Sequence, residues 1–161
     1  MIEQILDTLR AQGKYLMFAE SLTGGLLVDR FVSVAGASEV VLGSEVTYSE
    51  SLKIALLGVE EDTLEAKSAV SREVAIQMAK GALAVACGSA DLESTEVIAM
   101  STTGNAGPMI QGDESVGTVF VALATGLEVK VHKLQLAGDR NEIRNQTCDD
   151  AVEFLREHLG L

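Results

Sequence analysis

The sequence has few of the residues that build metal centres and histidine-based active sites. It contains two cysteines, Cys87 and Cys148, and two histidines, His132 and His158. The cysteines form no CxxC pair and have no histidine beside them, so we expect reduced thiols rather than a disulfide or a zinc site. The histidines are isolated from each other, and neither is placed for a Ser-His-Asp triad. We therefore expect no metal and no cofactor.

Basic residues and long apolar runs are also scarce. Lys and Arg number 12 against 24 Asp and Glu, which gives a formal net charge of -12. Such a surface repels phosphate backbones, so nucleic acid is not an expected partner. No stretch reaches the roughly 18 apolar residues of a membrane span, and no signal peptide precedes the first helix. We expect a cytoplasmic protein with no membrane partner, in which an anionic ligand needs a local cation or a helix N-terminus.

The rest of the composition is that of an ordinary globular protein, with 47% hydrophobic and 22% charged residues in 161. Sequence periodicity predicts helices over 2–12, 22–33, 49–57, 71–88 and 139–159, a helical turn over 60–67, and strands over 14–19, 39–48, 95–101, 117–124 and 127–136. Thr125-Gly126 separates the last two strands as in a hairpin. This order predicts one α/β domain over residues 1–161. We expect three α/β/α layers around a mixed, mostly parallel sheet that includes a C-terminal antiparallel hairpin.

A pair of glycines stands where the first apolar strand ends, in the stretch FAESLTGGLL at residues 18–27. Gly24 and Gly25 open the predicted helix although glycine is a poor helix former. Glycines in a first turn leave the backbone N–H groups accessible, so we expect something to approach them. Ser21 is either an N-cap, the commoner role of serine at a helix start, or a nucleophile at the mouth of the helix.

Two further clusters follow predicted strands. YSESLK, at 48–53, places Tyr48 at a strand end and Lys53 about one and a half helical turns later. TTGNAGP, at 102–108, is a second loop of small residues directly after a strand. A lysine in this position is usually a solvated surface residue, and the loop can be an ordinary turn. Loops at the ends of neighbouring strands can also converge on one site.

Together these stretches resemble the CinA C-terminal domain family, which includes stand-alone nicotinamide-nucleotide amidohydrolases. The matching segments occur in the family's order and are AESLTGGLL at 19–27, GSEVTYSESLK at 43–53, VSREVA at 70–75, STTGNAGP at 101–108, VGTV at 116–119 and GDR at 138–140. The resemblance covers the chain from about residue 5 to its end. Because only about one helix precedes the AES motif, we expect the stand-alone form.

The resemblance implies hydrolysis of nicotinamide mononucleotide (NMN) to nicotinic acid mononucleotide and ammonia by a Ser-Lys pair. It implies Ser21 as the nucleophile and Lys53 as the general base, with Tyr48 and Thr103 as polar helpers and Arg140 as the phosphate contact. The other substrate contacts it implies are Thr23, Gly24, Gly25, Gly104 and Asn105. We expect burial to lower the pKa of Lys53, Tyr48 to relay or orient the proton, and N–H groups of the glycine-bearing helix start to bind the oxyanion. The resemblance also implies a homodimer or larger homo-oligomer.

The chain departs from the family's pattern in two places. Glu50 stands where asparagine is usual, which adds a negative charge close to Lys53. Met109, Ile110 and Gln111 replace the glycines of the family's GITGIAGPGGG loop. These changes leave two alternatives open: a catalytically silent paralogue that binds a nucleotide or a protein, and an amidase for another small amide.

Overall fold

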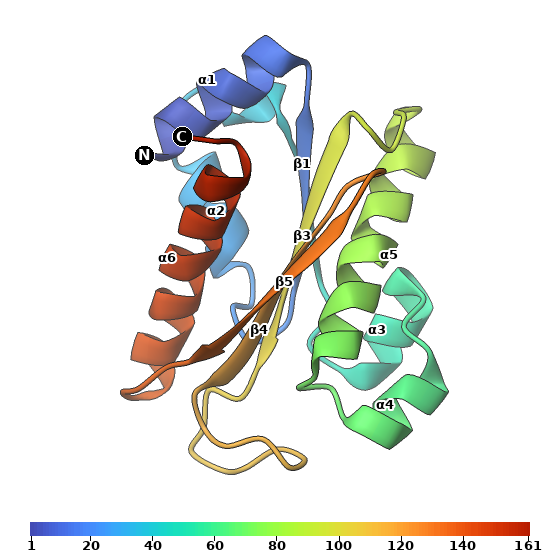
Figure 1. The fold of residues 1–161 in the computed structure, drawn as a ribbon, viewed down its shortest axis with the longest axis vertical. Coiled ribbons are helices and arrows are strands. Elements are labelled where there is room, and N and C mark those ends of the chain that lie inside the picture. Colours follow the sequence, from blue (N-terminus) through green and yellow to red (C-terminus); the bar gives the residue numbers. More distant parts are fainter.

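The computed structural model describes all 161 residues and shows one five-stranded sheet with helices on both faces (Figure 1). The elements are α1 (Ile2–Gln12), β1 (Tyr15–Glu20), α2 (Leu26–Val32), the 3₁₀ helix η1 (Ala37–Glu39), β2 (Val41–Val46), α3 (Glu50–Leu57), α4 (Glu61–Lys67), α5 (Arg72–Ala90), β3 (Val97–Gly104), β4 (Thr118–Ala124), β5 (Val129–Gln135) and α6 (Arg140–His158). Helices α1, α2 and α6 cover one face, and α3, α4 and α5 cover the other. The predicted α/β class is confirmed. None of these helices has both the length and the apolar character needed to cross a bilayer.

The strand order is β2-β1-β3-β4-β5, and the sheet is mixed. β1 pairs in parallel with β2 and with β3, while β3, β4 and β5 form an antiparallel meander. The predicted C-terminal hairpin is therefore confirmed. Because β1, β2 and β3 run in the same direction, their carboxyl ends meet at one edge of the sheet, the lower edge in Figure 1. The segments after these three strands all start there.

The apolar core lies on both faces of the sheet. On the α1, α2 and α6 face, Phe18 of β1 packs against Phe31 of α2, with ring centroids 5.1 Å apart. On the other face, α5 packs over β1 and β3 through small side chains such as Ala82 and Ala86. The predicted N-cap of α5 is confirmed, since the Ser71 hydroxyl accepts a hydrogen bond from the Val74 N–H. Because both faces are covered, β4 is buried along its whole length and β3 is buried up to Thr103.

Three predicted boundaries are wrong. The helix predicted over 22–33 begins at Leu26, because Gly24 and Gly25 have φ angles of 60° and 96° and form a turn instead. The strand predicted over 39–48 is shorter, since Ala37–Glu39 forms a 3₁₀ helix and pairing with β1 ends at Val46. These two corrections lengthen loops at the ends of β1 and β2. The strand predicted over 95–101 continues to Gly104, because residues 102–104, expected in a loop, pair with β4.

Helices α3 and α5 approach closely at one glycine. A Cβ atom on Gly81 of α5 would lie 2.0 Å from the carbonyl oxygen of Leu57, at the end of α3. Only glycine allows this backbone contact. The contact fixes the position of α3, and therefore of Lys53, against the rest of the fold.

Candidate active site

Ser21 and Lys53, which are 32 residues apart in the chain, are in contact. The Lys53 Nζ atom lies 3.0 Å from the Ser21 Oγ atom and donates to the carbonyl oxygens of Thr47 at 2.7 Å and Tyr48 at 3.4 Å. Ser21 directly follows β1, and Lys53 lies on α3, whose start is capped by the Ser49 hydroxyl. Parallel pairing of β1 with β2 brings these two chain segments together.

Burial changes the acidity of Lys53. Its side chain is among the largest fully buried ones, with the residue 1% exposed. Desolvation lowers the pKa of Lys53 from 10.5 to about 8, and the nearby Glu50 carboxylate acts in the opposite direction. The neutral amine is therefore accessible near physiological pH. With two hydrogens donated to the Thr47 and Tyr48 carbonyls, its lone pair is free to face the Ser21 hydroxyl.

A cavity of about 100 Å³ opens beside this pair. Its lining comes from α3 and β3, from the loops after β1, β2, α4 and β3, and from the start of α6. The lining residues are Ser21, Leu22, Tyr48, Lys53, Ala69, Val70, Thr103, Gly104, Ala106, Gln111 and Arg140. Six of the ten predicted site residues thus meet in one cavity: Ser21, Tyr48, Lys53, Thr103, Gly104 and Arg140. The other four, which are Thr23, Gly24, Gly25 and Asn105, are not part of its lining.

Thr23 and Asn105 are buried in structural hydrogen bonds instead. The Thr23 hydroxyl pairs with that of Thr102 at 2.8 Å. The Asn105 side chain accepts from the Gly107 N–H at 2.9 Å and donates to the Glu114 carbonyl. Both side chains therefore hold loops in place, and the structure does not bring them to the cavity.

The two predicted polar helpers line the cavity without touching the Ser21–Lys53 pair through their side chains. Tyr48 is 61% exposed, and its phenol accepts a hydrogen bond from Arg140 at 2.8 Å. The Thr103 hydroxyl donates to the Ala69 carbonyl at 2.6 Å. The predicted proton relay through the phenol has no hydrogen bond to carry it, because only the Tyr48 carbonyl approaches Lys53.

The glycine turn does not present the N–H groups of α2 to the cavity, contrary to the prediction. The fully buried Glu20 carboxylate accepts hydrogen bonds from the N–H groups of Gly25, Leu27 and Val28, each at 3.0 Å, and from the Ser44 hydroxyl at 2.9 Å. The glycines thus admit the protein's own carboxylate. Sequence reasoning missed Glu20, although its place just before the glycine pair was a usable signal.

One backbone donor next to Ser21 is left free. The Leu22 N–H makes no hydrogen bond within the protein, and Leu22 lines the cavity. The carbonyl of the same peptide group, that of Ser21, accepts from the Gly24 N–H at 3.1 Å. Because the two ends of a peptide group point in opposite directions, this bond turns the Leu22 N–H away from Gly24.

Arg140 and Arg144, both on α6, have no carboxylate partner. Arg140 donates to two neutral acceptors, the Gly107 carbonyl and the Tyr48 phenol, at the edge of the cavity. Arg144 donates to the carbonyls of Leu22 at 2.8 Å and Thr23 at 3.0 Å. Sequence reasoning missed Arg144, since nothing in its local sequence shows contacts with residues more than 100 positions away.

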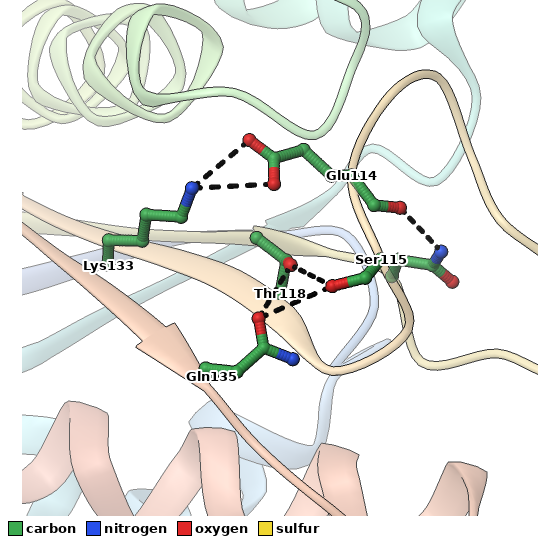
Figure 2. Close-up of polar contacts among 6 residues, drawn as sticks. Glu114, Ser115, Thr118, Lys133 and Gln135 are labelled. Carbon is green, nitrogen blue, oxygen red and sulfur yellow. Dashed lines mark hydrogen bonds and ion pairs between the residues drawn. The ribbon is translucent and has the colours of Figure 1, made fainter.

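Polar contacts attach the loop between β3 and β4 to β5 (Figure 2). Lys133 of β5 forms an ion pair with Glu114 at 3.2 Å, and the Gln135 side chain accepts from the Thr118 hydroxyl at 3.0 Å. Gly112 packs on Ser68, where an added Cβ would lie 2.6 Å from the Ser68 hydroxyl. These contacts hold Gln111 at the cavity, and its side chain makes no hydrogen bond within the protein.

The comparison with known proteins identifies the family of this fold. The sequence profile of the CinA C-terminal domain matches residues 1–159. The chain belongs to the CinA C-terminal domain family. It is 41% identical over 157 residues to a CinA-like protein of Myxococcus xanthus and 40% identical over 158 residues to one of Kosmotoga olearia. These alignments cover 96% and 98% of this chain but 35% and 36% of the relatives, so the chain spans about a third of their length.

Solved structures of CinA proteins have the same fold. The competence/damage inducible protein CihA of Agrobacterium tumefaciens is 34% identical, with a TM-score of 0.88 over 99% of this chain and 93% of that one. A CinA superfamily protein of Klebsiella pneumoniae is 29% identical, with a TM-score of 0.89 over 99% and 95% of the two chains. The sheet and its two helical layers are therefore those of the CinA C-terminal domain.

Proposed function

We propose that this CinA-family chain is an amidohydrolase that converts NMN to nicotinic acid mononucleotide and ammonia with Ser21 as the nucleophile and Lys53 as the base. The observation that carries the proposal is the 3.0 Å contact between Nζ of a buried lysine and the Ser21 hydroxyl beside a cavity. Such a pair needs no histidine. A pKa of about 8 leaves about a tenth of Lys53 neutral at pH 7.

The chemistry follows from the groups around Ser21. Lys53 takes the hydroxyl proton as Oγ attacks the carboxamide carbon, and the Leu22 N–H, which has no acceptor within the protein, stabilises the resulting oxyanion. Lys53 then passes the proton to the departing nitrogen, the C–N bond breaks, and ammonia leaves an ester on Ser21. A water molecule, deprotonated by Lys53, attacks that ester; the carboxylic acid departs and Ser21 regains its proton.

Arg140 supports a phosphate-bearing substrate. On a chain of net charge -12, it is a guanidinium without a carboxylate partner at the edge of the cavity. A phosphate group can replace the neutral phenol of Tyr48 as its acceptor, because charge-assisted hydrogen bonds are stronger than neutral ones. The cavity holds the reacting amide, and the phosphate then lies at its mouth.

The experiment is ammonia release from NMN by the purified protein, with Ser21→Ala and Lys53→Met as variants. We expect turnover by the natural chain and a loss of at least about 10³-fold in kcat in each variant. Turnover that is equal in the natural chain and in Ser21→Ala would overturn the mechanism.

A second candidate is an amidase for another small carboxamide. It is favoured by the cavity volume of about 100 Å³ and by Gln111, which lines the cavity where the family's pattern has glycine. A panel of primary amides of increasing size separates the two, since an enzyme of this second kind hydrolyses a small neutral amide with a higher kcat/KM than NMN.

A further inference from the structure

We propose that Arg144 is a positioning residue that holds the nucleophile turn, residues 21–25, so that the Leu22 N–H points into the cavity as the oxyanion donor. This inference rests on the role of Ser21 in the proposed function. Three observations support it. Arg144 donates to the carbonyls of Leu22 and Thr23, and it forms no ion pair with a carboxylate. The Leu22 N–H, next to Ser21, makes no hydrogen bond within the protein.

The nucleophile turn is held through three successive peptide carbonyls. The Ser21 carbonyl accepts from the Gly24 N–H at 3.1 Å. The Leu22 carbonyl accepts from Arg144 Nε at 2.8 Å, and the Thr23 carbonyl accepts from Arg144 Nη2 at 3.0 Å. Rotation of the Leu22–Thr23 or Thr23–Gly24 peptide group therefore breaks a bond to Arg144, and rotation of the Ser21–Leu22 group breaks the bond to the Gly24 N–H.

Glu20 holds the same turn from its other end. Its carboxylate binds the Gly25 N–H and the next two free N–H groups of α2, so these donors cannot serve the cavity. Arg144 binds carbonyl groups of the turn, and Glu20 binds N–H groups at its end and in α2. The Leu22 N–H, next to Ser21, is bound by neither side chain. This division leaves the N–H groups of Leu22 and Thr23 without an acceptor in the protein, and of these two residues only Leu22 lines the cavity.

Arginine suits this position for two reasons. Its planar guanidinium donates from two nitrogens in a fixed geometry, whereas lysine offers one freely rotating ammonium. The guanidinium also packs against Gly24, where an added Cβ would be in ordinary van der Waals contact with Arg144 Nη2 at 3.5 Å. The Arg144 Nη1 atom donates to the Asn141 side chain at 3.0 Å, which keeps the guanidinium oriented on α6.

The test compares Arg144→Met with Arg30→Met. Arg30 of α2 is the matched control, since it also links α2 to α6, through Asp149 and Asn145, but does not touch the nucleophile turn. We expect Arg144→Met to lower kcat for NMN about 10²-fold at unchanged KM, and Arg30→Met to leave kcat close to that of the natural chain. Equal kcat values for the two variants would overturn the proposal.

A second readout does not depend on NMN. A fluorophosphonate reacts with Ser21 Oγ to form an O–P bond while fluoride leaves and Lys53 takes the proton, and its phosphoryl oxygen occupies the oxyanion position. We expect the rate of Ser21 labelling, followed by mass spectrometry, to fall in Arg144→Met and not in Arg30→Met. If the natural chain releases no ammonia from NMN but is labelled, the proposed function fails. The labelling rates of the two variants then still test the positioning role of Arg144.

Rescue distinguishes positioning from folding. We expect guanidinium ion at millimolar concentration to restore part of the labelling rate of Arg144→Ala, and Arg144→Lys to keep an intermediate rate. Should Arg144→Met fail to fold, the folded Arg144→Lys variant takes its place. Labelling of Arg144→Lys at the rate of the natural chain would overturn the proposal.

Discussion

At the scale of single residues, the candidate site depends on how a lysine is buried. Lys53 is 1% exposed and has only Ser21 and two backbone carbonyls within hydrogen-bonding distance. It forms no ion pair with a carboxylate. Desolvation therefore controls its protonation, and Glu50 partly opposes this effect.

The first prediction concerns the pH dependence of turnover. Because the free enzyme needs neutral Lys53, kcat/KM should rise with pH through an apparent pKa near 8 and then level off. Glu50→Asn, which introduces the family's usual residue, removes a charge that raises the pKa of Lys53, so the profile should move to lower pH. The measurement is kcat/KM for NMN from pH 6 to 10. A profile of Glu50→Asn that coincides with that of the natural chain would contradict the electrostatic account.

The second prediction concerns stability. The pKa of Lys53 is about 8 in the folded protein and about 10.5 when the side chain is solvated, so between these values the unfolded state binds more protons. The free energy of unfolding should therefore rise with pH across this window, by about 3 kcal/mol from this residue. Lys53→Met should lose this rise and be the more stable protein at pH 7. Urea unfolding of both proteins at pH 7 and pH 10 measures how their free energies of unfolding change with pH. An equal change in the two proteins would show that Lys53 does not cause the rise.

At the scale of helices and strands, the sequence indicates which elements exist better than where they begin. The apolar periodicity of α1 and the serine N-cap of α5 are local signals, and both are confirmed. The start of α2 depends on Gly24 and Gly25 adopting positive φ around the Glu20 carboxylate, which involves hydrogen bonds that no periodicity reveals. The cavity likewise depends on the parallel pairing of β2 with β1, which is a contact between distant parts of the sequence.

The third prediction concerns the contact between α3 and α5. Gly81→Ala should push α3 away from α5, because its Cβ would lie 2.0 Å from the Leu57 carbonyl oxygen. We expect a loss of about 1–3 kcal/mol in stability and a lower kcat, since Lys53 moves with α3. The control is Gly88→Ala on the same helix, where nothing lies within 4 Å of the added Cβ and helix propensity should make the protein slightly more stable. The measurements are the melting temperature and kcat of both variants. Equal changes in Gly81→Ala and Gly88→Ala would contradict the proposed role of the contact between α3 and α5.

At the scale of the whole molecule, the parallel half of the sheet carries the chemistry and the antiparallel half supports it. β1, β2 and β3 deliver Ser21, Lys53 and Thr103 to the cavity, while β5 anchors the loop that carries Gln111 (Figures 1 and 2). Family motifs in the sequence led to the Ser21–Lys53 pair. Arg144 could not be found in this way, because its role lies in contacts with distant backbone groups. Glu20 lies within the first of these motifs, but its hydrogen bonds to backbone N–H groups are visible only in the structure. The predicted homo-oligomer stays a prediction for light scattering to test.

The position of β2 at the edge of the sheet has a consequence for heat inactivation. β2 pairs only with β1, and it leads directly into the segment that carries Thr47, Tyr48 and Lys53. Local opening of this edge separates the amine from the hydroxyl while β1, β3 and β4 stay folded. Activity should therefore disappear on heating several degrees below the loss of circular dichroism, and amide hydrogens of β2 and α3 should exchange faster than those of β3. Coincident transitions, with equally slow exchange at both places, would show instead that the site and the sheet melt as one unit.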